Sequence, residues 1–187
     1  MLYELHEAQH ASLTPLRLWA KATAEFYGNP FSVFSHNPMS RVLTAGADVV
    51  LRMTQRYSKP PFGLKETLIQ GKTVEVSEEV MLDKPFCQLL HFKRDTKRKD
   101  PKVLMVAPLS GHYATLLRDT AKTFLPDHDV YITDWKDARA VPVTDGPFHL
   151  DDYVAYVQEF IGFLGPDIHV VSVCQPTVPV LAAISLL

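Results

Sequence analysis

Cys174 stands where one apolar segment of the sequence turns abruptly into another. Residues 168–173 form a short apolar run, Cys174 and Gln175 follow it, and an apolar stretch of helical composition continues over 177–187. A strand, a reactive side chain at a sharp turn and then a helix make up the nucleophile elbow of acyl-transfer enzymes. A cysteine at the start of a helix also gains thiolate character from the aligned backbone dipoles. The pattern therefore favours nucleophilic chemistry at Cys174.

The neighbours of Cys174 depart from the usual elbow, and a second interpretation stays open. Elbows of this kind carry glycine two residues before and after the nucleophile, whereas this chain has Ser172 and Pro176. Serine is small, and a proline in the first helical turn lacks only an N–H that would be unpaired anyway. Free cysteine is also among the most buried residue types, so topology alone equally favours Cys174 as a packing residue. Cys87 lies inside a predicted strand and is expected in the core.

Acyl transfer needs two hydrogen-bond donors for the oxyanion that develops on the substrate. They are usually the N–H of the residue after the nucleophile and an N–H from the loop after an earlier strand. Gln175 and the Ser110–Gly111 loop occupy these two places. A glycine that ends a strand also marks an ordinary turn, so the second half of this pattern is not specific.

Three further side chains stand at the carboxyl ends of predicted strands. His112 either contacts substrate or begins a helix. Asp134 and Trp135 close another strand, where an aromatic ring either lines an apolar acyl pocket or packs in the core. These three residues are the candidate substrate-binding positions.

Continuous apolar runs predict strands that are buried on both faces, and amphipathic stretches between them predict helices. The predicted strands are 73–82, 86–93, 103–107, 130–134 and 168–173, of which the first two form an antiparallel pair. Helices are predicted over 113–125 and 150–164. Strands that alternate with helices predict a parallel sheet with helices on both faces, and the active sites of such sheets lie at the carboxyl ends of the strands.

The first third of the chain predicts helices instead. Proline directly after a capping residue marks helix starts at Thr14 and Asn37, and the apolar residues that follow recur at helical spacing. Apolar stripes of this kind are more often core than surface. We expect a helical arm over residues 1–62 and an α/β domain over 63–187.

Composition excludes several function classes. The chain carries 19 Lys and Arg against 21 Asp and Glu, so there is no net positive field to bind nucleic acid. Neither GxGxxG nor GxxxxGK[ST] occurs, and the two cysteines lack metal-ligand spacing, so no cofactor, metal or disulfide is expected. The N-terminus has no signal-peptide pattern and no run is long enough to span a membrane, which predicts a cytoplasmic protein.

Three segments resemble the intracellular polyhydroxyalkanoate (polyhydroxybutyrate) depolymerases. They are Val106–Arg118, Val130–Arg139 and Val171–Pro176. The resemblance covers essentially the whole chain and implies an α/β-hydrolase-like fold, here a truncated parallel sheet with an N-terminal helical arm. It implies hydrolysis of polyester with Cys174 as the nucleophile of a Cys-His-Asp triad. The granule surface or its oligomers would be the partner.

Two features separate this chain from that family's pattern. In hydrolases of this type the acid and the histidine follow the nucleophile, yet no Asp or His follows Cys174. We therefore expect a truncated chain with little or no activity by itself. The alternatives are a synthase-like acyltransferase, which would show glycines around its cysteine, and a non-catalytic granule-associated protein that adheres through the helical arm. The oligomeric state and the choice between water and a thiol as acceptor stay open.

Overall fold

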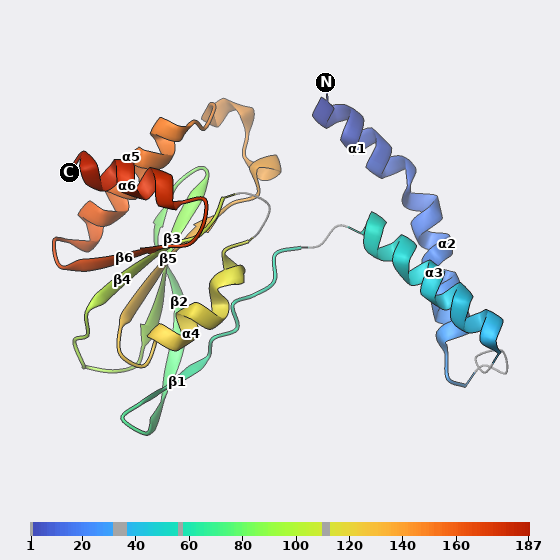
Figure 1. Ribbon diagram of the computed structural model, residues 1–187, viewed down its shortest axis with the longest axis horizontal. Helices are drawn as coiled ribbons and strands as arrows, with labels where there is room; N and C mark the ends of the chain where they lie inside the picture. Colours follow the sequence, from blue (N-terminus) through green and yellow to red (C-terminus); the bar gives the residue numbers. More distant parts are fainter. Residues whose placement is uncertain (1, 32–36, 56–57, 110–112) are drawn as a thin grey trace. The chain divides into compact units, whose positions relative to one another are not determined.

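The computed structural model describes residues 2–31, 37–55, 58–109 and 113–187 of the chain (Figure 1). They form two compact units, which divide between Ser58 and Lys59. The first unit is helical and the second is a mixed α/β unit. No helix among the described residues has both the length and the apolar character needed to cross a membrane.

The N-terminal unit consists of three helices, α1 (Leu2–Ser12), α2 (Thr14–Gly28) and α3 (Pro38–Thr54). The predicted start of α3 is confirmed, because the Asn37 side chain accepts a hydrogen bond of 3.0 Å from the N–H of Met39. α2 and α3 pack against each other.

The buried side of this helix pair differs from the predicted one. Ala20 and Ala47 are 0% and 4% exposed, whereas Trp19 is 61% exposed. Two helices approach closely only where the side chains between them are small. The small residues therefore form the interface, and the large apolar residues that were expected in a core stay on the surface of the unit.

The second unit is built on a six-stranded mixed sheet with the order β1-β2-β3-β5-β4-β6. Its strands are β1 (Glu66–Ile69), β2 (Lys72–Asp83), β3 (Cys87–Arg94), β4 (Lys102–Val106), β5 (Asp129–Trp135) and β6 (Ile168–Ser172). The first three strands and the β3–β5 pairing are antiparallel, and β4 is parallel to both β5 and β6. The prediction that the last three strands are parallel neighbours is confirmed, but they make up only half of a mainly antiparallel sheet. β1 was not predicted from the sequence.

Helices cover both faces of this sheet. They are η1 (Ala114–Leu117), α4 (Arg118–Phe124), α5 (Leu150–Leu164) and α6 (Thr177–Ser185), while the short helices η2 (Ala138–Ala140) and η3 (Val143–Asp145) lie in the connection after β5. The β4-to-β5 and β5-to-β6 crossovers run in opposite directions along the sheet, so right-handed connections place their helices on opposite faces. Figure 1 shows α4 on one face and α5 with α6 on the other.

β4 lies at the centre of the core, as its continuous apolar sequence predicts. Its residues Val103 to Val106 are at most 1% exposed. They are buried because β5 and β6 flank the strand and the helices cover both faces. The chain emerges from this strand at Ala107, which begins the turn that matters for the site.

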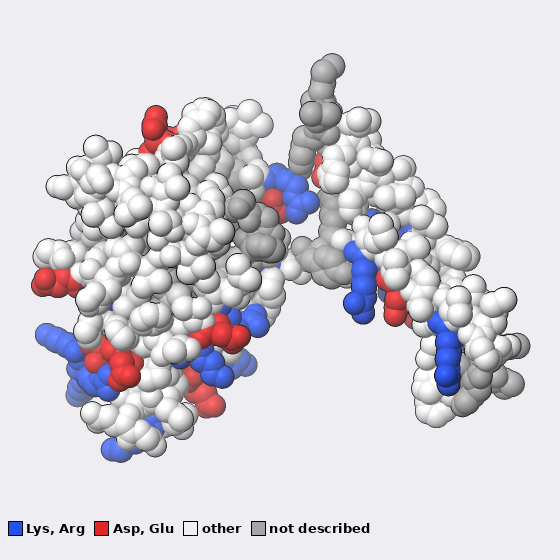
Figure 2. Space-filling model, viewed as in Figure 1, with Lys and Arg blue, Asp and Glu red and all other residues white. Residues whose placement is uncertain are grey.

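The basic segment 93–99 is solvated only in part. Lys93, Lys97 and Lys99 are exposed, as the charge of the segment suggests, whereas its two arginines form ion pairs. Arg94 is buried and contacts Asp100 at 2.8 Å and the carbonyl oxygen of Leu125 at 3.0 Å. Arg98 contacts Asp100 at 2.5 Å and Asp127 at 3.2 Å. Basic and acidic side chains lie interspersed on the face in Figure 2. These guanidinium groups tie the loop before β4 to the turn before β5.

Candidate active site

The register of the sheet brings the end of β4 next to the end of β6. Val106 pairs with Ser172 in the parallel ladder, so the turns that follow these two residues lie side by side. The N–H of Leu109 donates a hydrogen bond of 3.1 Å to the side-chain oxygen of Gln175. The turn after β4 is thus held directly against the turn that carries Cys174.

Cys174 occupies a sharp turn between β6 and α6. Its φ angle is +69°, and among the described residues only one other non-glycine residue, Gln70, has a positive φ. The N–H of Thr177 closes the turn by donating to the carbonyl oxygen of Cys174 at 3.2 Å. A side chain in this left-handed region is strained, and such strain persists mainly at functional sites. Cys174 is also exposed, unlike the buried packing residue of the alternative interpretation.

Cys87 lies in the core, as expected. Its side chain is fully buried at the start of β3. Burial raises the pKa of the Cys87 thiol well above its ordinary value, and the charge of Asp134 adds to the effect. Only Cys174 combines exposure with a position at a strand end.

Of the candidate oxyanion donors, the structure describes Gln175 but not Ser110 or Gly111. Gln175 directly follows Cys174, and its side chain holds Leu109, the residue before the predicted loop. Ser110, Gly111 and His112 lie outside the described residues. The structure therefore places Leu109, the residue that precedes the predicted donor loop, beside the elbow.

The side chains of Asp134 and Trp135 lie on opposite faces of the sheet, because successive strand residues alternate between the faces. Asp134 is 4% exposed and forms an ion pair with Lys59, while its Oδ1 has no hydrogen-bond partner among the described atoms. The Trp135 side chain is buried, and its Nε1–H donates to the carbonyl oxygen of Ala107 at 2.8 Å. Tyr153 from α5 donates to the same oxygen at 3.2 Å. Two side chains thus fix the backbone at the point where the chain leaves β4.

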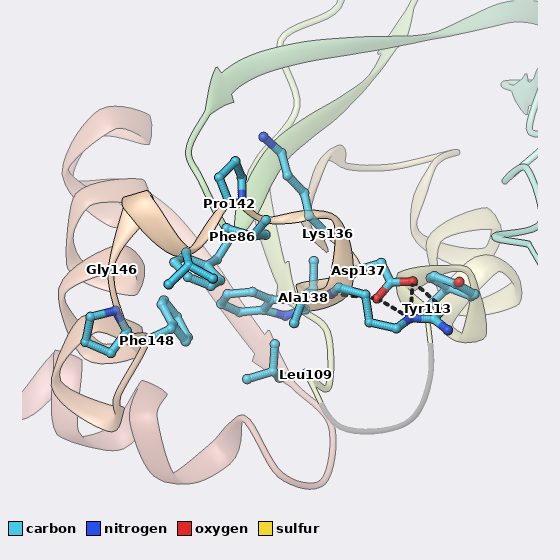
Figure 3. Close-up of a pocket in the computed structure, with 14 residues that line it drawn as sticks. Phe86, Leu109, Tyr113, Lys136, Asp137, Ala138, Pro142, Gly146 and Phe148 are labelled. Atoms are coloured by element: carbon cyan, nitrogen blue, oxygen red, sulfur yellow. Dashed lines mark hydrogen bonds and ion pairs between the residues drawn. The ribbon is translucent and has the colours of Figure 1, made fainter. Parts of the chain in front are cut away.

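A cavity of about 890 Å³ opens beside this turn (Figure 3). Its lining is mainly apolar and comprises Phe86, Leu109, Tyr113, Trp135, Lys136, Asp137, Ala138, Arg139, Val141, Pro142, Val143, Gly146, Pro147 and Phe148. In Figure 3, Phe86 and Phe148 lie at one end and Asp137 with Tyr113 at the other, with Leu109 and Ala138 between them. Trp135 is the predicted site residue that the cavity includes, and Asp134 is not part of it.

Most of this lining was not predicted from the sequence. The segment 136–148 looks like a long polar loop in the sequence, with prolines and glycine as its only marks. It folds back over the end of β5, with two short turns of 3₁₀-helix, η2 and η3. Ring contacts then place Phe148 5.7 Å from Trp135 and 4.8 Å from Phe86, measured between ring centroids. The available signal was the Pro147–Phe148 pair, which lies between the end of β5 and the predicted helix.

The arrangement provides an exposed thiol at a strained turn, a neighbouring turn that is anchored by hydrogen bonds, and an apolar cavity that shares Leu109 with that turn. Within the part of the chain that the structure describes, no hydrogen bond is formed to the Cys174 sulfur. These features suit a first nucleophilic step, in which a thiolate attacks an acyl carbon. In comparisons with family models, curated proteins and solved structures, nothing matches this chain.

Proposed function

We propose that this chain carries the nucleophile of a carboxylic ester hydrolase of the intracellular polyhydroxyalkanoate depolymerase type, with Cys174 as that nucleophile. The observation that carries the proposal is the exposed cysteine in a left-handed turn between β6 and α6, beside the turn after β4. This is the place that the nucleophile elbow takes in an α/β-hydrolase. The polyester substrate is supported by the sequence resemblance alone.

The proposed chemistry begins with acylation of the thiol. The Cys174 thiolate attacks the ester carbonyl, the C–O bond to the alcohol breaks, and the released alkoxide takes up a proton. The acyl group is then held as a thioester, which water cleaves to a carboxylic acid while the thiol is regenerated. The N–H of Gln175 is the proposed donor to the oxyanion that forms in the first step.

Acylation of Cys174 is tested with 4-nitrophenyl butyrate, whose good leaving group needs no general acid. We expect a burst of about one equivalent of nitrophenolate per chain and a butyryl mass increase on the peptide that contains Cys174. Cys174→Ala should abolish both signals. Cys87→Ala should keep both signals, because the Cys87 thiol is buried and its pKa is raised. An adduct on Cys87, or a burst that survives in Cys174→Ala, would contradict the proposal.

Specificity for polyester is tested separately with a trimer of 3-hydroxybutyrate. Mass spectrometry should detect a slowly formed 3-hydroxybutyryl adduct on Cys174 and slow release of free acid, in line with the low activity expected of this chain. Acyl transfer to an added thiol such as coenzyme A at the expense of free acid would instead indicate the acyltransferase alternative. If 4-nitrophenyl butyrate labels Cys174 but the hydroxybutyrate trimer does not, the proposed esterase activity would stand and the polyester substrate would be rejected.

A second candidate function is adhesion of the N-terminal unit to a hydrophobic polymer surface. Trp19, Met39 and Met53 are 61%, 65% and 81% exposed, which is a large apolar surface for a helical unit. Sedimentation of the full chain with polyhydroxybutyrate particles tests this function. The triple replacement of these residues by serine should release the chain, whereas Cys174→Ala should sediment unchanged. Unaltered sedimentation of the triple variant would reject adhesion through this unit.

A further inference from the structure

We propose that the cavity beside Trp135 binds an uncharged, mainly apolar acyl chain and discriminates against chains with a charged end. The identification of the occupant as an acyl group rests on the proposed function, whereas the preference for an uncharged apolar ligand rests on the cavity itself. Its volume of about 890 Å³ lies in the range of small-molecule binding sites. Three observations on its floor, its charges and its position carry the proposal.

The floor of the cavity is aromatic and held in place. Trp135 donates to the carbonyl oxygen of Ala107 at 2.8 Å and packs edge-on against Tyr153, with ring centroids 4.5 Å apart. Phe148 contacts both rings, at 5.7 Å from Trp135 and 6.2 Å from Tyr153. Rings that are already packed lose little freedom when a ligand binds. The floor therefore offers a preformed apolar surface.

The charged groups near the cavity compensate one another. The Lys136 Nζ contacts Asp83 at 2.5 Å, and the Arg139 guanidinium contacts both oxygens of Asp137 at 2.5–3.0 Å. Two cations and two carboxylates thus form two ion pairs. In Figure 3 the Lys136 side chain points away from the rings of Phe86 and Phe148. An ionic ligand would have to break one of these pairs or lose its hydration without a partner, so the site favours an uncharged ligand.

A single residue, Leu109, links the cavity to the turn that carries the candidate nucleophile. Leu109 lines the cavity, and its N–H donates to the side chain of Gln175, which directly follows Cys174. Cys174 itself is not part of the lining. An acyl chain in the cavity would therefore extend past Leu109 toward the thiol, and binding of the chain is separable from the chemistry.

Trp135 supplies a direct readout of binding. The chain has two tryptophans, so Trp19→Phe leaves Trp135 as the only one. We expect octanamide to change the Trp135 emission in a saturable way at pH 7. Octanoate and octylammonium have the same chain length with a negative and a positive end, and each should bind at least about tenfold more weakly. Equal affinity for all three probes, or no response to octanamide, would overturn the proposal.

A matched pair of variants tests whether the probe occupies this cavity. Ala138 and Ala140 lie in the same short helix η2 and are both exposed, but only Ala138 lines the cavity. Ala138→Phe should weaken octanamide binding by about tenfold or more because the ring fills space that the probe needs. Ala140→Phe should leave the affinity within about twofold. Equal effects of the two variants would place the binding site elsewhere.

The Cys174→Ala variant separates this proposal from the proposed function. It should bind octanamide with unchanged affinity, because Cys174 does not line the cavity. Octanamide binding without acylation of Cys174 by 4-nitrophenyl butyrate would support the cavity and reject the esterase. Acylation without a Trp135 response to octanamide would support the esterase and reject the cavity.

Discussion

Replacement of Cys174 by glycine should stabilise the protein slightly while it removes the thiol. A residue with a Cβ atom in the left-handed region is destabilised by about 1–2 kcal/mol relative to glycine, and Cys174 has a φ of +69°. Glycine loses more freedom on folding, which offsets about 0.5–1 kcal/mol of that gain. The exposed thiol contributes little packing. Cys174→Gly should therefore raise the free energy of unfolding by about 0–1.5 kcal/mol.

Alanine at the same position separates strain from packing. Cys174→Ala keeps the Cβ atom and hence the strain, so its stability should stay within about 0.5 kcal/mol of the parent. Both variants are measured by urea unfolding with the slopes compared, because a changed slope would signal a changed unfolded state. A loss of more than about 2 kcal/mol in Cys174→Ala would show that the sulfur is a packing group after all.

Gln70 provides the matched control for the Cys174 variants. It is the other described non-glycine residue with a positive φ, at +52°, and it precedes Gly71 in the turn between β1 and β2. Gln70→Gly should be stabilising by a similar margin relative to Gln70→Ala, and neither change should affect acylation. If glycine stabilises at Gln70 but not at Cys174, the strained elbow is refuted.

Three further predictions concern the groups that support the site. Arg94→Met should lower stability by about 2–4 kcal/mol in urea unfolding, because it removes a buried partner of Asp100 although a second arginine still pairs with that carboxylate. Tyr153→Phe should lower stability by only about 0.5–1.5 kcal/mol, since the carbonyl oxygen of Ala107 still accepts from Trp135. A larger loss in urea unfolding would mean that the Tyr153 hydroxyl stabilises the fold by more than this one hydrogen bond. Burial by itself raises the pKa of Asp129, but the hydrogen bond to His91 at 2.7 Å and its charge outweigh this and leave the pKa lowered. The resulting stabilisation is complete above the ordinary Asp pKa of about 3.9 and is lost as the pH falls through the lower folded-state value, so Asp129→Asn should flatten the decline of stability in this acid range. Thermal unfolding as a function of pH measures this difference, and an unchanged decline would count against the Asp129 assignment.

Local sequence patterns determined much of the scaffold that holds the candidate site. The helices α2 and α5 span Thr14–Gly28 and Leu150–Leu164, as their apolar periods predicted. The predicted cap of α2 is wrong, because Thr14 is the first helical residue and Leu13 precedes it without a side-chain cap. The parallel arrangement of β4, β5 and β6 also followed from continuous apolar runs separated by amphipathic helices. These features are accessible because helix caps, turns and hydrophobic periods act between residues a few positions apart.

Only the tertiary structure decided the features that make Cys174 a candidate nucleophile. Its positive φ, its exposure and the bond between Leu109 and Gln175, which lie 66 residues apart in the chain, depend on the register of β4 and β6. The closure of the segment 136–148 over Trp135 and the exposed apolar surface of the helical unit were likewise absent from the local pattern. The spacing of apolar residues indicates which face of a helix or strand is apolar, but not which neighbouring element buries that face. That choice depends on side-chain size and strand register, and both act only when distant segments meet.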